Sequence, residues 1–246
     1  MVDIHCHILP AIDDGPPSWE VAMEMCAMAW QDGITHIVAT PHANSRFRYD
    51  RSAFTKLAEE LTRRTDGRPT VSLGCDFHFS YENFVAVLQN PREFTVGGTQ
   101  YLLVELDDYL VPLSVSRNFA TLLSKGLVPI ITHPERNPLL QGDPQRVLGW
   151  VKQGCLVQLT ANSFTGRWGP RARAAAEWLL RRNAVHVVAS DAHGVSSRPP
   201  ILSLAQEEVA ILVGDSAAAA LVNDNPLAIL NGEKPQMLRQ GSLTSS

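Results

Sequence analysis

The chain has 246 residues, of which 45% are hydrophobic and 19% charged, so it contains enough apolar material for one sizeable core. Its formal net charge of -4 excludes a general electrostatic footprint for nucleic acid or an anionic membrane, which favours small-molecule or protein partners. The four cysteines are scattered without a Cys-x-x-Cys pair, and we interpret them as reduced thiols. The opening residues lack a secretory pattern and no apolar run approaches the roughly 18 residues that span a bilayer, so we expect a cytoplasmic protein without membrane insertion.

Short apolar or β-branched segments recur along the chain and predict buried strands. Segments of helical composition separate them, and two of these end at Gly33 and Gly126, because glycine accepts the positive φ that terminates a helix. Apolar strands that alternate with helices predict a parallel sheet covered on both faces, either doubly wound or closed into a β/α barrel. The seven predicted strands are residues 2–5, 34–40, 70–77, 101–106, 128–132, 155–160 and 185–190.

One domain is predicted over residues 1–240, because no composition break, long linker or internal repeat divides the chain. Residues 199–230 follow the last strand and are typical of two or three helices, which we expect to pack on the outside of a barrel. Residues 241–246 are small and polar, and we expect them to form a flexible tail.

Residues of the types that bind metals follow nearly every predicted strand. The carboxyl ends of the strands form the active-site face of a β/α barrel, so these residues are expected to meet at one mouth. His5 and His7 lie two positions apart on a strand and can share one cation. Carboxylates combined with imidazoles suit Zn²⁺, Mn²⁺ or Fe²⁺ rather than Ca²⁺. The whole set is His5, His7, Asp13, Asp14, His42, Asp76, His78, Glu105, His133, Asp191 and His193.

Each histidine taken alone is as readily a hydrogen-bonded structural residue as a ligand. Taken together, many charged side chains at strand ends disfavour that reading, because unpaired buried charges are costly. His36 and His186 lie inside predicted strands and are interpreted as packing residues. Cys6 lies between two histidines of a strand, so we expect it to face the other side.

Arginines also follow the predicted strand ends. Arg136 and Arg198 lie three and five positions after His133 and His193, and a planar guanidinium binds phosphate oxygens in a bidentate manner. These arginines beside a metal cluster predict a phosphoryl substrate. Arg46 and Arg48 follow His42, but a solvated surface role explains them equally well.

The segments DIHCHILPAIDDG, ATPH, GCD, LLVEL, ITHPERN and ASDAHG, in this order, resemble the PHP (polymerase and histidinol phosphatase) family. Within it, the chain is similar to the capsule-biosynthesis branch of manganese-dependent protein-tyrosine phosphatases. The resemblance covers residue 1 to about residue 230. It implies a distorted (β/α)7 TIM-like barrel, the PHP fold, with three divalent metal ions, Mn²⁺ or else Fe²⁺ or Zn²⁺.

The resemblance also implies roles for individual residues. Arg136 and Arg198 match the arginines of this branch that contact phosphate. Asp76 departs from the branch, which often has glutamate there, and the shorter side chain puts the affinity of its site in question. The implied ligands are His5, His7, Asp76 and Asp191 for the first metal, Asp76, Glu105 and His133 for the second, and Asp14, His42 and His193 for the third.

The implied activity is hydrolysis of phosphotyrosine in a protein, such as a bacterial tyrosine autokinase of capsular or exopolysaccharide synthesis. Our hypothesis is in-line attack on phosphorus by a metal-bound hydroxide, without a covalent phosphoenzyme. Cysteine-dependent phosphatases need an arginine six positions after the cysteine, and none of the four cysteines has one.

Three alternatives remain open at this stage. The same cluster can serve a phosphatase of histidinol phosphate or another small phosphoester. An amidohydrolase-like barrel also begins with two histidines two positions apart, but often bridges its metals with a lysine at a strand end, whereas Lys56, Lys125, Lys152 and Lys234 lie in helical or tail segments. A non-catalytic protein that binds phosphotyrosine is the third alternative.

Overall fold

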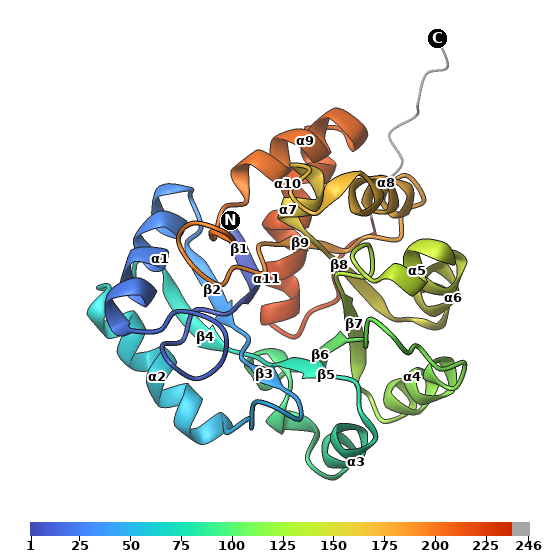
Figure 1. The fold of residues 1–246 in the computed structure, drawn as a ribbon, viewed down its shortest axis with the longest axis horizontal. Helices are drawn as coiled ribbons and strands as arrows, with labels where there is room; N and C mark the ends of the chain where they lie inside the picture. The colour runs from blue at the N-terminus through green and yellow to red at the C-terminus, as the bar shows by residue number, and fades with distance from the viewer. Residues whose placement is uncertain (238–246) are drawn as a thin grey trace.

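The computed structural model describes residues 1–237, and its parallel strands form a ring that is surrounded by helices (Figure 1). The strands divide into two sheets, in the orders β1-β2-β4 and β3-β5-β6-β7-β8-β9. Their bounds are β1 Val2–Cys6, β2 His36–Ala39, β3 His42–Ala43, β4 Thr70–Leu73, β5 Asp76–His78, β6 Tyr101–Glu105, β7 Val128–Thr132, β8 Leu156–Thr160 and β9 Val187–Ala189.

Two of the seven predicted strands differ from the observed ones. The strand predicted at 34–40 is observed as β2, and the short strand β3 follows it beyond the predicted range, after Pro41, which has no N–H for a ladder. The strand predicted at 70–77 divides at Gly74 into β4 and β5. A Cβ on Gly74 would lie 2.9 Å from Cγ1 of Val38 in the neighbouring strand β2, so there is no room for a larger residue at this position.

Backbone hydrogen bonds join β1 to the segment after β9. Asp191 N donates to His5 O and His7 N donates to Ala192 O, each at 2.8 Å, and Cys6 forms a parallel bridge with Ala192. Together with the continuous chain through β2–β3 and β4–β5, these bonds complete the ring. The predicted distorted β/α barrel of seven strands is therefore confirmed.

Helices follow most of the strands and cover the outside of the ring. The predicted helix ends are confirmed at Gly33 and Gly126, whose φ angles are 89° and 77°. The bounds are α1 Trp19–Gln31, α2 Arg51–Arg64, α3 Tyr81–Gln89, η1 Pro91–Glu93, η2 Val96–Gly98, α4 Val115–Ser124, α5 Pro138–Gly142, α6 Gln145–Gln153, α7 Ala161–Phe164, α8 Gly169–Leu180, α9 Ser203–Val213, α10 Asp215–Val222 and α11 Asp224–Leu230.

The apolar core has an inner and an outer part. The inner cluster contains Val2 and Ile4 of β1, whereas Cys6 belongs to the outer cluster between strands and helices. The register of β1 against β2 shifts between Asp3 and Cys6, and such a bulge changes which side a strand residue faces. The shift is located where β1 passes from the apolar interior to His5 at the mouth of the barrel.

One of the last three helices lies where the sequence did not place it. We expected residues 199–230 to pack outside the barrel, but α11 lies near the centre of the ring (Figure 1) and Ile229 is fully buried in the inner cluster. Asn225 Nδ2 donates to His186 O at 2.8 Å, and Tyr101 Oη donates to Glu233 O at 2.7 Å. The helix and the segment after it thus cover the end of the barrel where the strands begin.

Among residues 1–237, no helix is long and apolar enough to cross a bilayer. The predicted domain end at residue 240 and the predicted tail at 241–246 lie outside the described residues.

Candidate metal centre

The nine side chains predicted as metal ligands come together at the mouth formed by the carboxyl ends of the strands. Ligand atoms of seven of them form three overlapping groups, and within each group all members lie within 4.8 Å of one another. The first group is His5, His7 and Asp76; the second is His7, Asp14, His42 and His193; the third is His42, Asp76 and Glu105. The other two border these groups, His133 Nε2 at 3.8 Å from Glu105 Oε1 and Asp191 Oδ1 at 3.3 Å from His5 Nε2. Residues from β1, β3, β5 and β6 and from the loop after β9 therefore converge as the barrel topology predicts.

Asp76 is the centre of this cluster. Its Oδ2 lies 3.7 Å from His5 Nε2, 3.9 Å from His7 Nε2 and 3.0 Å from His42 Nδ1. Both carboxylate oxygens and His42 Nδ1 are buried and have no hydrogen bond of acceptable geometry within the described part of the chain. Buried polar atoms without partners are costly, and a cation between them would satisfy all three. These residues therefore fit a metal ion.

His5 at the end of β1 and His7 just beyond it face each other with their Nε2 atoms only 3.4 Å apart. His5 Nδ1 is bonded to Gln158 Oε1 at 2.9 Å, and His7 Nδ1 to Asp13 Oδ2 at 2.8 Å. Because both partners are acceptors, each Nδ1 carries the proton, and each Nε2 presents a lone pair to the cluster. Histidine ligands of metals are held in this way.

Two carboxylates bind further histidines at the edge of the cluster. Asp14 Oδ1 lies 3.3 Å from His42 Nε2 and 3.5 Å from His193 Nε2. Glu105 Oε1 lies 3.8 Å from His133 Nε2. The groupings differ in detail from the three sets implied by the resemblance, because His42 lies between two groups.

Electrostatics at His42 favour a positive charge. Burial lowers the pKa of this imidazole, but the adjacent carboxylates of Asp14 and Asp76 outweigh burial and raise it to about 11. The surrounding carboxylates thus stabilise a cation at this position. Bound divalent ions would supply that charge in place of the proton.

Asp191 connects the cluster to the two predicted phosphate-binding arginines. Its Oδ1 lies 3.3 Å from His5 Nε2, whereas its Oδ2 accepts hydrogen bonds from Arg136 and Arg198. Burial raises the pKa of Asp191, but the charges of His5 and the two arginines hold it well below its usual range. The carboxylate therefore stays ionised, with one oxygen toward the cluster and one toward the guanidinium groups.

Trp168 is a residue of the site to which the sequence assigned no role. The Arg136 Cζ lies 3.9 Å and the Arg198 Cζ 5.5 Å from the centroid of the Trp168 ring, so one aromatic face contacts both guanidinium groups. Gln158, which fixes His5, was also outside the predicted set, whereas Asp13, which fixes His7, was among the metal-binding residue types predicted at the mouth. The polarity of Gln158 in a largely apolar strand was the available signal for it.

Backbone geometry also marks the mouth of the barrel. His133 and Asp191, which follow β7 and β9, have φ angles of 34° and 51°. Left-handed backbone is unfavourable for residues with a Cβ, and it clusters at functional sites. Packing in the strands therefore holds the backbone of both residues in a conformation that they would otherwise rarely adopt.

Residues predicted to be structural lie outside the cluster. His36 Nε2 is bonded to Ser72 Oγ at 2.9 Å, and His186 Nδ1 accepts from Val157 N at 3.1 Å. Arg46 and Arg48 are exposed, and the Arg46 Cζ lies 5.0 Å from the Phe47 ring, in keeping with the solvated alternative. His78 borders the site, with Nδ1 3.4 Å from Glu105 Oε2.

Comparison with known proteins decides the family. The sequence profile of the family described as capsular polysaccharide synthesis, CpsB/CapC, matches residues 1–231. The chain belongs to this family. CpsB/CapC relatives include tyrosine-protein phosphatase YwqE of Bacillus subtilis (strain 168), 34% identical over 80% of this chain and 79% of that protein. Tyrosine-protein phosphatase CpsB of Streptococcus pneumoniae is 28% identical over 94% of this chain and 98% of that protein.

Solved structures agree with this membership. A structure from work on B. subtilis YwqE and S. pneumoniae CpsB, described as unique metal-dependent tyrosine phosphatases, has a TM-score of 0.88 and 32% identity, over 97% of this chain and 100% of that chain. A β-aspartyl dipeptidase from Fervidobacterium islandicum AW-1 has a TM-score of 0.60 at 13% identity over 98% of this chain and 76% of that chain, and shares the fold alone. The resemblance found in the sequence is thus confirmed.

Proposed function

We propose that this chain is a metal-dependent phosphatase that hydrolyses phosphotyrosine in a protein. The observation that carries the proposal is the convergence of nine His, Asp and Glu side chains on the mouth of the barrel, with the buried carboxylate of Asp76 at its centre. The relatives named tyrosine-protein phosphatases support this choice of substrate. A thiol nucleophile is not supported, because all four cysteines are buried.

The proposed cofactors are three divalent metal ions, with Mn²⁺ as the native metal. Bound divalent ions polarise phosphoryl oxygens and lower the pKa of water toward ~7, which supplies a nucleophile at neutral pH. The chain contributes the fixed geometry, since Gln158 and Asp13 hold the lone pairs of His5 and His7 toward the cluster. The proposed ligands are His5, His7, Asp14, His42, Asp76, Glu105, His133, Asp191 and His193.

Arg136 and Arg198 are proposed to bind the phosphoryl group. Each guanidinium has five N–H donors, and the bond to Asp191 Oδ2 leaves donors available for equatorial phosphoryl oxygens. The bond also fixes both groups beside the metal ligands, so little reorganisation is needed as charge develops. A tyrosine phenolate, with a pKa near ~10, leaves more readily than an alkoxide and needs less assistance from an acid.

The proposed partner is a phosphotyrosine-containing protein of capsular polysaccharide synthesis, such as a bacterial tyrosine kinase. Membership of the CpsB/CapC family supports the pathway. Dephosphorylation of candidate phosphoproteins by the purified protein would identify the partner.

Activity of the purified protein with Mn²⁺ on phosphotyrosyl peptide, p-nitrophenyl phosphate and histidinol phosphate tests the proposal. We expect the peptide to be hydrolysed with the highest kcat/KM, a chelator to abolish turnover and a thiol-alkylating reagent to leave it intact. Activity that survives the chelator but not alkylation would refute the mechanism, and a preference for histidinol phosphate would refute the substrate class.

A matched pair of histidine variants separates the cluster from the rest of the barrel. His5→Ala removes a proposed ligand, so both bound Mn²⁺ and turnover should fall. His36 lies at the start of β2, and its ring is bonded to Ser72 of β4, away from the cluster. The variant His36→Ala should therefore retain metal and activity. Equal losses in the two variants would contradict the assignment of His5.

A further inference from the structure

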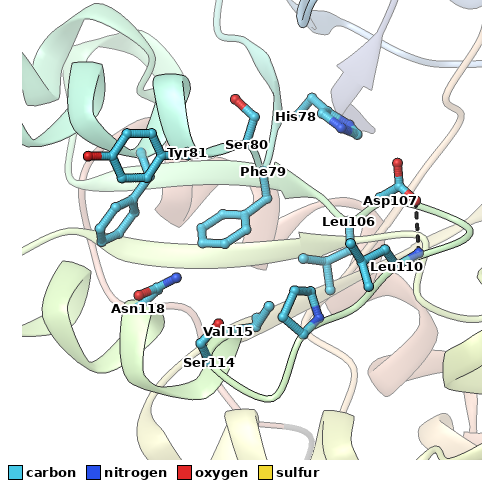
Figure 2. A pocket seen from close by; sticks show the side chains of 12 residues that line it. His78, Phe79, Ser80, Tyr81, Leu106, Asp107, Leu110, Ser114, Val115 and Asn118 are labelled. Carbon is cyan, nitrogen blue, oxygen red and sulfur yellow. Dashed lines mark hydrogen bonds between the residues drawn. The ribbon is translucent and has the colours of Figure 1, made fainter.

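Figure 2 shows an apolar groove, and one of its lining residues, His78, contacts Glu105 of the candidate metal centre. Its volume of about 480 Å³ lies within the roughly 300–1,000 Å³ typical of ligand-binding pockets. The groove is formed by β5 and α3 on one side and by the segment from β6 to α4 on the other. Its apolar lining consists of Phe79, Phe84, Leu106, Leu110, Pro112 and Val115.

The groove borders the metal centre. His78 lines it and also lies 3.4 Å from Glu105 Oε2 through its Nδ1, and Phe79 N donates to Glu105 O at 2.8 Å. In Figure 2, His78 and Asp107 lie at one end of the groove, and Asn118 lies toward the opposite end. A substrate with its phosphoryl group at the cluster therefore has this groove beside it.

The rim of the groove presents large apolar side chains on a loop that is held in place. Tyr109 and Leu113 are 91% and 87% exposed, and Leu110 is 66% exposed although it lines the groove. Asp107 Oδ1 accepts from the backbone N of Tyr109 and of Leu110 at 2.7 and 2.9 Å, and Arg146 donates to two further carbonyls of the loop. Exposed apolar groups gathered at one place mark a binding surface, and a preformed loop lowers the entropic cost of binding.

We propose that this groove binds an apolar side chain next to the phosphotyrosine of the substrate polypeptide. The inference rests on the proposed function and adds a specificity site to it. The cavity is large enough for a side chain of the substrate in addition to the phosphotyrosine ring. A small phosphoester has no such neighbouring side chain. Ser80, Ser114 and Asn118 supply hydrogen-bonding groups along the groove for the peptide backbone.

Selectivity between peptides tests the proposal. Two phosphotyrosyl peptides differ only in having Leu or Ser on both sides of the phosphotyrosine, and p-nitrophenyl phosphate reports turnover without a peptide. The protein with Mn²⁺ should prefer the Leu peptide by about tenfold in kcat/KM, the scale on which apolar pockets discriminate. Leu110→Gln should reduce this ratio to about twofold, because it places an amide in the apolar wall.

A matched control is available on α9, where Ile211 is 79% exposed and does not line the groove. Ile211→Gln makes the same chemical change elsewhere and should preserve the ratio between the two peptides. An unchanged ratio in Leu110→Gln, or an equal fall on all three substrates, would overturn the proposal.

Other results separate this inference from the proposed function. Hydrolysis of p-nitrophenyl phosphate without any preference between the peptides would overturn the groove assignment and leave the phosphatase standing. Failure on every substrate would overturn both. A concentration-dependent dimer that Leu110→Gln abolishes would assign the surface to a second copy of the chain and would also overturn the proposal.

Discussion

The two ends of the barrel differ in what the same strands bury: apolar side chains at one end and charged side chains at the other. Where the strands begin, apolar residues of the inner cluster pack against Ile229 of α11, and polar atoms such as Tyr101 Oη have backbone partners. Where the strands end, buried imidazoles and carboxylates face one another, and the two carboxylate oxygens of Asp76 have no hydrogen bond within the described residues. One end stabilises the fold, and the other carries a concentration of charge that only a bound cation would make favourable.

The largest effect that sharpens this comparison is expected from Asp76→Asn. Loss of the central carboxylate should lower kcat/KM by at least about a hundredfold, since even residues that merely orient metal ligands are worth 10–100-fold. Melting curves provide the check. Mn²⁺ should raise the melting temperature of the unsubstituted protein by more than that of the variant, because binding to the folded state alone is stabilising and the variant keeps only the group of His7, Asp14, His42 and His193 intact. Equal responses to Mn²⁺ would break the proposed distinction.

The opposite end should respond in stability and not in turnover. Ile229→Ala leaves a cavity in the inner cluster and should lower the free energy of unfolding by about 2–4 kcal/mol, as measured by denaturant titration. The kcat of the protein that remains folded should stay within about twofold, since α11 lies far along the strands from the ligands. A large fall in kcat with unchanged stability would show that the two ends are not separable.

Trp168 permits a finer test within the mouth itself. Trp168→Ala removes the aromatic face under both arginines and should lower kcat/KM by about tenfold, the effect of one or two cation–π contacts. Trp168→Phe keeps an aromatic face and should recover most of the activity. A Phe variant as impaired as the Ala variant would point instead to bulk or to the indole N–H.

A pH dependence is predicted at the end of the barrel that α11 covers, and at neutral pH it is the smallest of these effects. Burial lowers the pKa of His186 to about 4, below its ordinary value of 6.5, so the unfolded chain binds this proton more readily than the folded one. Stability from this group is complete above about pH 6.5 and is lost as the pH falls toward about 4, by up to about 1.4 kcal/mol per pH unit. Unfolding titrations at several pH values should show a shallower loss in His186→Gln, and identical slopes would contradict this.

The sequence predicted which His, Asp and Glu side chains meet at the mouth, because the position of a residue at a strand end is a local property and closure of the barrel brings such ends together. It did not predict the partners of the ligands. Gln158 contacts His5 across 153 positions of the chain, and no local pattern encodes that pairing. The predicted position of α11 was wrong for a related reason, since the composition of an apolar helix does not specify which apolar surface it covers.

The strand breaks at Pro41 and Gly74 have causes in the local sequence that the strand prediction did not use. Pro41 cannot donate to a ladder, and Gly74 allows close approach to Val38. The aromatic contact of Trp168 with two arginines depends on three separate loops meeting, so it required the fold.

The central claim is that the residues at the mouth hold divalent metal ions. An anomalous difference map from crystals of the Mn²⁺-loaded protein tests it most directly. We predict peaks within coordination distance of Asp76, flanked by His5 and His7 on one side and by His42 and Glu105 on the other. A loaded crystal without peaks at this mouth, or with peaks only at other surfaces, would contradict the account.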